Sequence, residues 1–140
     1  MDGLSGAASV IAVVDISAKV ASLCFQYSVA VKDAKADIER LLGKVKDVKN
    51  VLEKLQQLLN KHEKSHLLTT HSIVDSLKDC YQQLQGLQDQ LEPSKGRRAM
   101  QRFGVRALKW PFTSKQVEKM VINFEQYERT FSLALQIDQT

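Results

Sequence analysis

A short polar segment near the middle of the chain matches a metal-binding pattern. His62, Glu63 and His66 have the H-E-x-x-H spacing of zinc proteases, in which two histidines one helical turn apart bind the metal and the glutamate activates water. A working site also needs a third ligand and an apolar helix that orients the pair, whereas this segment lies among polar residues at a predicted helix end. His71, which follows shortly after, does not have the extended metzincin spacing. We therefore predict a solvent-exposed turn here and no bound metal.

The rest of the sequence offers equally little catalytic chemistry. It has no glycine-rich phosphate loop, no Ser/His/Asp or Cys/His set on facing predicted elements, and no paired carboxylates in apolar surroundings. Cys24 and Cys80 lie far apart among apolar residues of helical spacing, where a free thiol behaves as a small hydrophobic side chain. We therefore expect no enzymatic activity, no cofactor and no disulfide.

A run of basic residues is the most distinctive charged feature. No acidic residue occurs between Pro93 and Val117, and a short helix from about Gly96 would be apolar on one side and cationic on the other. Such a segment can bind anionic lipid headgroups, an acidic protein or, least favoured here, nucleic acid, and a plain solvated helix face has the same composition. The candidate contact residues are Lys95, Arg97, Arg98, Arg102, Arg106 and Lys109.

The N-terminal segment, residues 3–31, contains only Asp15 and Lys19 as charges, and their spacing of four would let them pair on one side of a helix. The other residues are mostly small or apolar, so the helix is apolar on nearly every face, which is typical of a central helix. About 20 such residues also suffice to cross a bilayer, although a charged pair makes a permanent span costly. We expect burial at rest and membrane insertion on activation, through Gly3, Leu4, Gly6, Val10, Ile11, Val13 and Val14.

The overall pattern predicts one all-α domain over residues 1–140, a four- to five-helix bundle around a central apolar N-terminal helix. Apolar residues make up 44% of the chain and charged residues 26%, which is typical of a globular protein, and only two prolines interrupt it. Apolar residues recur every three or four positions through residues 32–92, which predicts a long helical hairpin. Residues 95–138 are expected to form the basic short helix and a C-terminal helix.

The start of that C-terminal helix carries three expectations. Pro111 would end the basic helix. Trp110 and Phe112 flank it, and aromatic residues beside a helix break more often close a core than contact a membrane interface. Ser114 is expected to cap the last helix.

Two blocks of sequence bear a family resemblance. The opening Met-Asp-Gly-Leu-Ser-Gly-Ala-Ala-Ser-Val-Ile-Ala-Val-Val, residues 1–14, is similar to the start of HeLo-like domains, the N-terminal domains of fungal STAND (NLR-like) receptors. Residues 107–112 (Ala-Leu-Lys-Trp-Pro-Phe), followed by Lys115, Val117, Glu118 and residues 131–136, resemble the C-terminal half of that family. The two blocks bracket almost the whole chain, and the Trp-Pro-Phe block is the more specific.

The resemblance implies a bundle related to HeLo domains and to the four-helix bundle of the mixed-lineage kinase-like necroptosis executor. In such families an NLR or amyloid signalling protein brings bundles together, and an N-terminal apolar helix then permeabilises the plasma membrane. This activity belongs to programmed cell death in fungal innate immunity and heterokaryon incompatibility. The chain lacks a nucleotide-binding region, a repeat region and an amyloid motif, so we expect either one domain of a larger protein or a small stand-alone effector.

Two functional hypotheses follow. The first is a cell-death effector that waits in the cytoplasm, oligomerises on a signal and damages the plasma membrane. A cytosolic location is also favoured by the few cysteines and by Asp2, which stands where a secretory signal would be basic. The alternative is a non-enzymatic adaptor that relays a signal by homotypic contact between bundles, for which the exposed faces of residues 32–91 would matter most.

Overall fold

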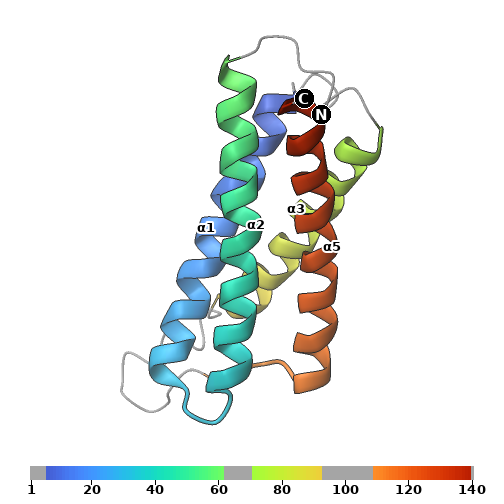
Figure 1. The fold of residues 1–140 in the computed structure, drawn as a ribbon. Helices are drawn as coiled ribbons and strands as arrows, with labels where there is room; N and C mark the ends of the chain where they lie inside the picture. The colour runs from blue at the N-terminus through green and yellow to red at the C-terminus, as the bar shows by residue number, and fades with distance from the viewer. Residues whose placement is uncertain (1–5, 62–70, 93–108, 140) are drawn as a thin grey trace.

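The computed structural model describes residues 6–61, 71–92 and 109–139, and over these ranges the chain is built from helices and short connections with no strand (Figure 1). The four helices in the described ranges are α1 (Gly6–Ala30), α2 (Lys35–Lys61), α3 (His71–Leu91) and α5 (Ser114–Gln139). The prediction of an all-α bundle with an apolar N-terminal helix is confirmed. The segment with the H-E-x-x-H pattern, residues 62–66, and most of the predicted basic helix lie outside the described residues.

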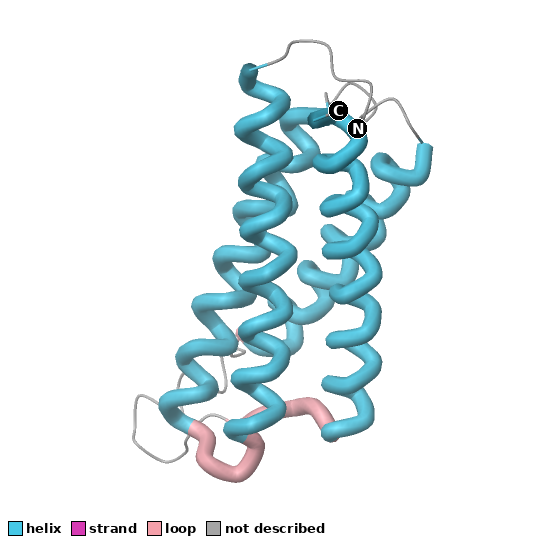
Figure 2. The backbone as a smooth tube through the Cα atoms, viewed as in Figure 1, coloured by secondary structure: helices cyan, strands magenta, loops and turns pink. Residues whose placement is uncertain are grey.

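The four helices form a ring in which each packs mainly against two others. α1 packs against α2 and α3, and α5 packs against the same two helices from the opposite side. α1 and α3 run in one direction and α2 and α5 in the other (Figure 1). The packed pairs α1–α2 and α3–α5 are therefore antiparallel, whereas α1–α3 and α2–α5 are parallel. Residues 31–34 and 109–113 form loops at the same end of the bundle (Figure 2).

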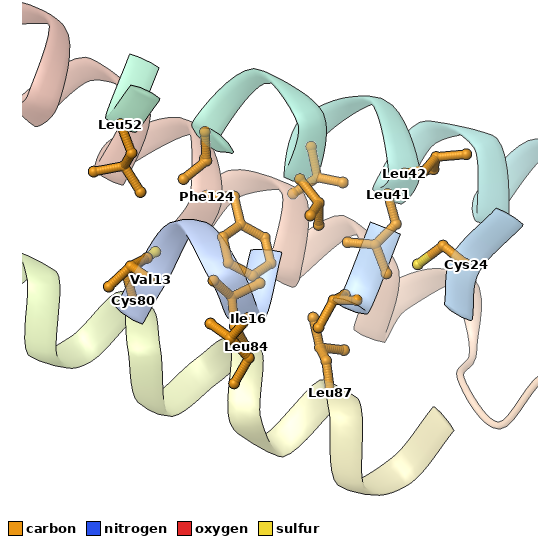
Figure 3. Packing of buried hydrophobic residues seen from close by; sticks show 14 of the residues in the cluster. Val13, Ile16, Cys24, Leu41, Leu42, Leu52, Cys80, Leu84, Leu87 and Phe124 are labelled. Atoms are coloured by element: carbon orange, nitrogen blue, oxygen red, sulfur yellow. The ribbon is translucent and has the colours of Figure 1, made fainter. Parts of the chain in front are cut away.

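On α2 and α3 the core consists of the stripes that the three-and-four spacing predicts. On α3 each stripe residue from Ile73 to Leu91 is buried, and on α2 the same holds from Ile38 to Leu55. Phe124 of α5 points into the centre of the core toward Ile16 of α1 and Leu84 of α3 (Figure 3). Because side chains of different helices interdigitate there, the core is continuous across the bundle.

A lysine ties α2 to α5 on the outside of this core. The ammonium group of Lys44 lies 3.1 Å from Glu128, 3.7 Å from Glu125 and 3.5 Å from Asp47. Partial burial opposes the charge of Lys44, but the hydrogen bond to Glu128 and the surrounding carboxylates outweigh this and raise the pKa of the lysine. The lysine therefore stays charged where the two helices meet.

The N-terminus of α5 is capped by Thr113, so the prediction that Ser114 caps it is wrong by one residue. The backbone N–H of Gln116 donates to Oγ1 of Thr113 at 3.1 Å, and the N–H of Thr113 donates to Oε1 of Gln116 at 2.8 Å. These reciprocal bonds are a capping box. Ser114 instead donates to Oδ2 of Asp37 at 2.6 Å and links α5 to the first turn of α2.

The capping assignment predicts different costs for two neighbouring hydroxyl groups. Thr113→Ala should lower the free energy of unfolding by about 1 kcal/mol, because an N–H at the helix end loses its acceptor. Ser114→Ala, the matched control, should cost less than about 0.5 kcal/mol, because its bond to Asp37 is exposed. Urea denaturation measures both values, and a larger loss for Ser114→Ala would contradict the assignment.

Candidate functional site: the two faces of the N-terminal helix

The inward face of α1 is a continuous seam against α2 and α3. Its residues recur at alternating intervals of three and four, the spacing at which a helix keeps one side toward its partners. All six are buried, and five are apolar or aromatic: Val10, Val13, Ser17, Val20, Cys24 and Tyr27.

One hydroxyl interrupts this seam at its middle. Ser17 is completely buried, and its Oγ finds no hydrogen-bond partner in the described part of the chain. A buried hydroxyl without a partner costs about 1–3 kcal/mol relative to its hydrated state. The contact between α1 and the bundle is therefore weaker at its centre than an entirely apolar seam would be.

The outward face of α1 is also largely apolar. Ile11, Phe25 and Val29 are 43%, 59% and 70% exposed. Ala18 and Ser22 lie between them and are exposed as well, and both side chains are small. Ile11, Ala18 and Phe25 follow one another at intervals of seven residues, which keeps them on one side of the helix. α1 thus has a second stripe of apolar side chains that the other described helices do not cover, and polar Ser22 and Gln26 are exposed on the same side.

The two charges of α1 lie on this outward side. Asp15 and Lys19 are both exposed, and within the described ranges neither makes an ion pair. Their spacing of four would let them pair, but the pair is not formed in this structure. An exposed pair of this kind gains only a few tenths of a kcal/mol, which is small compared with the entropy of two side chains held in place.

The predicted insertion residues divide between the two faces. Val10 and Val13 are buried in the inward seam, Val14 is partly buried, and Ile11 faces outward. Gly6 is the first residue of α1. Gly3 and Leu4 lie outside the described residues. A charge at Ile11 therefore tests the exposed surface of α1, whereas a charge at Val10 would first disrupt the core.

An aromatic cluster holds the C-terminal end of α1. The Tyr27 hydroxyl donates to the carbonyl oxygen of Leu91 at 2.8 Å and so joins the ends of α1 and α3. The Tyr27 ring packs edge-on against Trp110 with centroids 5.5 Å apart, and Trp110 packs likewise against Phe112 at 5.2 Å. Both residues beside Pro111 contact the core, as the sequence predicts. The Trp110 indole N–H is buried and has no acceptor among the described residues.

Most of the predicted basic contact residues cannot be placed on this surface. Lys109 is exposed, next to Trp110 of the aromatic cluster. The others lie outside the described residues: Lys95, Arg97, Arg98, Arg102 and Arg106.

The two thiols are structural. Cys24 and Cys80 are free and buried, with Cys80 near Val13 and Cys24 farther along the core near Leu42 (Figure 3). Burial raises the pKa of each thiol to about 12, with a smaller contribution from Asp79 at Cys80. Nucleophilic and metal-binding cysteines require the thiolate, which is scarce here at neutral pH. In the part of the chain that the structure describes, no three His, Cys, Asp or Glu side chains are grouped so that they could bind a metal ion.

Comparison with known protein families identifies the family of this chain. Residues 1–138 match the family described as pigment biosynthesis cluster protein PigL N-terminal. The chain belongs to this PigL N-terminal family. No curated protein and no solved structure gives a significant match. The family match supports a fungal helical domain, while its description does not name HeLo-like domains and so leaves that finer resemblance unconfirmed.

For this PigL N-terminal domain, sequence reasoning missed the features that distinguish the two faces of α1. Ser17, Tyr27, Phe25 and Val29 were not singled out, because a segment that is apolar nearly all round gives little signal of which side is buried. The interval of seven between Ile11, Ala18 and Phe25 was the available clue. It becomes informative once the inward seam is known.

The buried hydroxyl gives a first prediction for α1. Ser17→Ala should raise the free energy of unfolding by about 1 kcal/mol relative to Ser28→Ala, because it removes an unpartnered polar group. Ser28 is a fair control, since it lies on the same helix, its hydroxyl donates to the Phe25 carbonyl oxygen near the surface, and both changes gain the same helix propensity. Equal stabilities in urea denaturation would show that Ser17 is satisfied in solution.

The raised thiol pKa values predict a loss of stability in alkali. The unfolded chain releases the thiol protons from about pH 9, whereas the folded state keeps them to about pH 12, so the unfolded state binds fewer protons in this window. The free energy of unfolding should therefore fall between pH 9 and 10, with a slope approaching about 1.4 kcal/mol per unit for each thiol. Replacing Cys24 and Cys80 with Ala should flatten the slope. Val20→Ala, a core truncation without a thiol, should leave it unchanged.

Proposed function

We propose that this PigL N-terminal domain is a non-enzymatic effector of a fungal signalling system that oligomerises on a signal and permeabilises membranes through α1. The observation that carries the proposal is that α1 exposes large apolar side chains, at Ile11, Phe25 and Val29, in addition to its buried apolar face. A helix with only a structural role needs one apolar stripe, and solvent favours polar residues on its other side. The second stripe therefore calls for a further environment, and lipid is one.

The length of the apolar stretch supports insertion. Val10–Ala30 comprises 21 residues and is long and apolar enough to cross a bilayer, where about 20 residues are required. Core helices of soluble proteins also meet this criterion, so length alone does not decide. Asp15 and Lys19 add a cost in lipid, which pairing between them would lower once water is removed.

The contacts that hold α1 in the bundle support its release. The inter-helix polar contacts of Lys44, Ser114 and Gln83 join α5 to α2 and to α3, and Gln83 donates to the Tyr127 hydroxyl at 3.0 Å. α1 is held by its apolar seam and by Tyr27 at its C-terminal end. Lipid chains replace apolar contacts at little cost, whereas they cannot replace hydrogen bonds. The remaining three helices keep their polar contacts when α1 departs.

The basic residues supply the attraction to the membrane in this proposal. Lys95, Arg97, Arg98, Arg102, Arg106 and Lys109 would contact anionic headgroups of the plasma membrane, each worth about 1 kcal/mol near the surface. The resting domain would stay in the cytoplasm. An upstream NLR or amyloid signalling protein would gather several copies, as the HeLo-like resemblance implies.

A second candidate is an adaptor that relays a signal by homotypic contact between bundles and does not enter lipid. The observation that favours it is the outward face of α2, where exposed charges of both signs follow one another: Glu39, Arg40, Lys46, Asp47 and Lys54. A surface that carries both signs of charge selects a complementary partner surface. Lipid headgroups would not require such a pattern.

Dye release from liposomes separates the two candidates. The wild-type chain, oligomerised through a fused coiled coil, should release dye from liposomes that contain anionic lipid. Ile11→Lys should reduce release on the order of tenfold or more, because a charge within a spanning helix costs about 3 kcal/mol. The matched control is Ile122→Lys on α5, where the isoleucine is 47% exposed against 43% for Ile11.

The outcomes are distinct. The effector is supported if dye release falls in Ile11→Lys and does not fall in Ile122→Lys. Dye release should also fall in a variant that has glutamine in place of Arg97, Arg98, Arg102 and Arg106. Absence of release by the oligomerised wild-type chain, folded by circular dichroism, would contradict it and favour the adaptor. Equal loss with Ile11→Lys and Ile122→Lys would also contradict a specific role of α1.

A further inference from the structure

We propose that the outward stripe of α1 is a pairing surface for a second copy of this chain, with the two α1 helices antiparallel about a two-fold axis at Ala18. This deepens the proposed function, because self-association is its first step and that step now has a surface. The argument for the pairing rests on the spacing and charges of the exposed residues of α1.

The spacing of the large side chains is symmetric about Ala18. Ile11 lies seven residues before it and Phe25 seven residues after it, all three on the exposed side of the helix. When two such helices cross antiparallel at Ala18, Ile11 faces the partner's Phe25, and Phe25 faces the partner's Ile11. The small side chain at the crossing lets the backbones approach closely, as alanine does at helix–helix contacts. A two-fold contact of this kind uses the same patch on both copies.

The charges select the antiparallel orientation. Asp15 lies three residues before Ala18 and Lys19 one residue after it. In the antiparallel pair each Asp15 is offset from the partner's Lys19 by two residues, about 3 Å along the helix axis, which the lysine side chain spans. In a parallel two-fold pair the charged edges of the two helices would lie on opposite sides of the contact, so Asp15 could not reach the partner's Lys19. Both charges lack an ion pair among the described residues of one copy, so the partner satisfies them.

A second copy is the partner that fits this stripe before α1 reaches lipid. Opposite charges in the middle of an apolar face are costly in hydrocarbon, whereas a two-fold partner neutralises both of them. The exposed apolar residues of α5 offer no comparable surface, because every exposed residue between Ile122 and Leu133 has a long polar side chain and no small residue stands at a crossing point. Of these two surfaces, the stripe on α1 is thus the one whose apolar and charged residues match those of a second copy.

The size of the contact fits a step that depends on a signal. A single pair of helix faces is smaller than the roughly 1,200 Å² at which stable interfaces begin. Pairing is therefore weak for free copies and becomes complete when an upstream protein raises their local concentration. The resting chain would then be mostly monomeric.

Disulfide trapping tests the position of the two-fold axis. Ala18→Cys places the two introduced thiols opposite each other, within the range that a disulfide allows. Ser22→Cys is the matched control: it lies on the same exposed side, but the two introduced thiols would be eight residues, about 12 Å, apart along the axis. Cys24 and Cys80 give little background because they are buried with pKa values of about 12.

Under mild oxidation, the Ala18→Cys dimer should form at least tenfold faster than the Ser22→Cys dimer, as measured on non-reducing gels. Equal rates, or a faster Ser22→Cys, would overturn the proposed pairing. The experiment uses the full chain without lipid. Slow disulfide formation by Ala18→Cys together with normal dye release would therefore overturn the pairing proposal and leave the membrane proposal standing. Fast disulfide formation without dye release would support the pairing and contradict the membrane proposal.

A charge exchange tests the orientation. Asp15→Lys and Lys19→Asp should each weaken dimerisation of the full chain several-fold in sedimentation equilibrium, because like charges then meet across the axis. The double exchange should restore it, since the reciprocal pairs return with reversed signs. Thermal unfolding of all three variants checks that the monomer is intact. A double exchange that dimerises no better than the single ones would exclude the antiparallel pair.

Discussion

The structure depends on one constraint: a helix in a four-membered ring can bury only part of its circumference, and α1 is apolar around most of its own. The bundle covers the seam from Val10 to Tyr27 and leaves Phe25 and Val29 in water. Fully burying a side chain of this kind contributes about 1.5–3 kcal/mol. Water thus favours any partner that covers the outward stripe, and the four described helices offer none.

The kinds of contact in the bundle divide its helices into two groups. α5 is joined to α2 by Lys44 and Ser114 and to α3 by Gln83, through groups that must keep specific geometry. α1 adds a long apolar seam and few such bonds, apart from those of Tyr27. Hydrogen bonds and ion pairs fix which helices stay together, while apolar contact is non-directional and can be exchanged for another apolar surface. Among the described residues, the directional contacts of α1 with other helices come from Tyr27, so α1 is the helix whose partner can change most readily.

The sequence predicts the buried side of a helix well only where apolar residues recur among polar ones. On α2 and α3 the apolar positions stand against a polar background, so their spacing of three and four predicted which side of each helix is buried, and the stripes from Ile38 and from Ile73 are buried in the structure. On α1 there is little polar background, so the helix was predicted but its buried side was not. The cap at Thr113 was missed although the sequence carries its signal: Gln116 stands three residues after Thr113, as a capping box requires, whereas apolar Val117 stands three residues after Ser114. The pairing expected within α1 between its aspartate and its lysine fails because spacing permits an ion pair without making it favourable in water.

The inward and outward stripes of α1 are both interrupted by polar residues, and this bears on the function of a PigL N-terminal domain. Each is mostly apolar and is interrupted by polar residues near its middle: Ser17 faces the core without a partner, and Asp15 and Ser22 face solvent. An unbroken apolar seam at Ser17 would hold α1 in the bundle more firmly, and an apolar residue in place of Asp15 would let the outward stripe associate without regard to orientation. The buried hydroxyl lowers the free energy needed to detach α1, and the exposed charge restricts its outward contact to a partner with a cation at the matching position. A helix that must rest in one environment and act in another requires both properties, because its two states then differ by a few kcal/mol and a signal can shift the population between them.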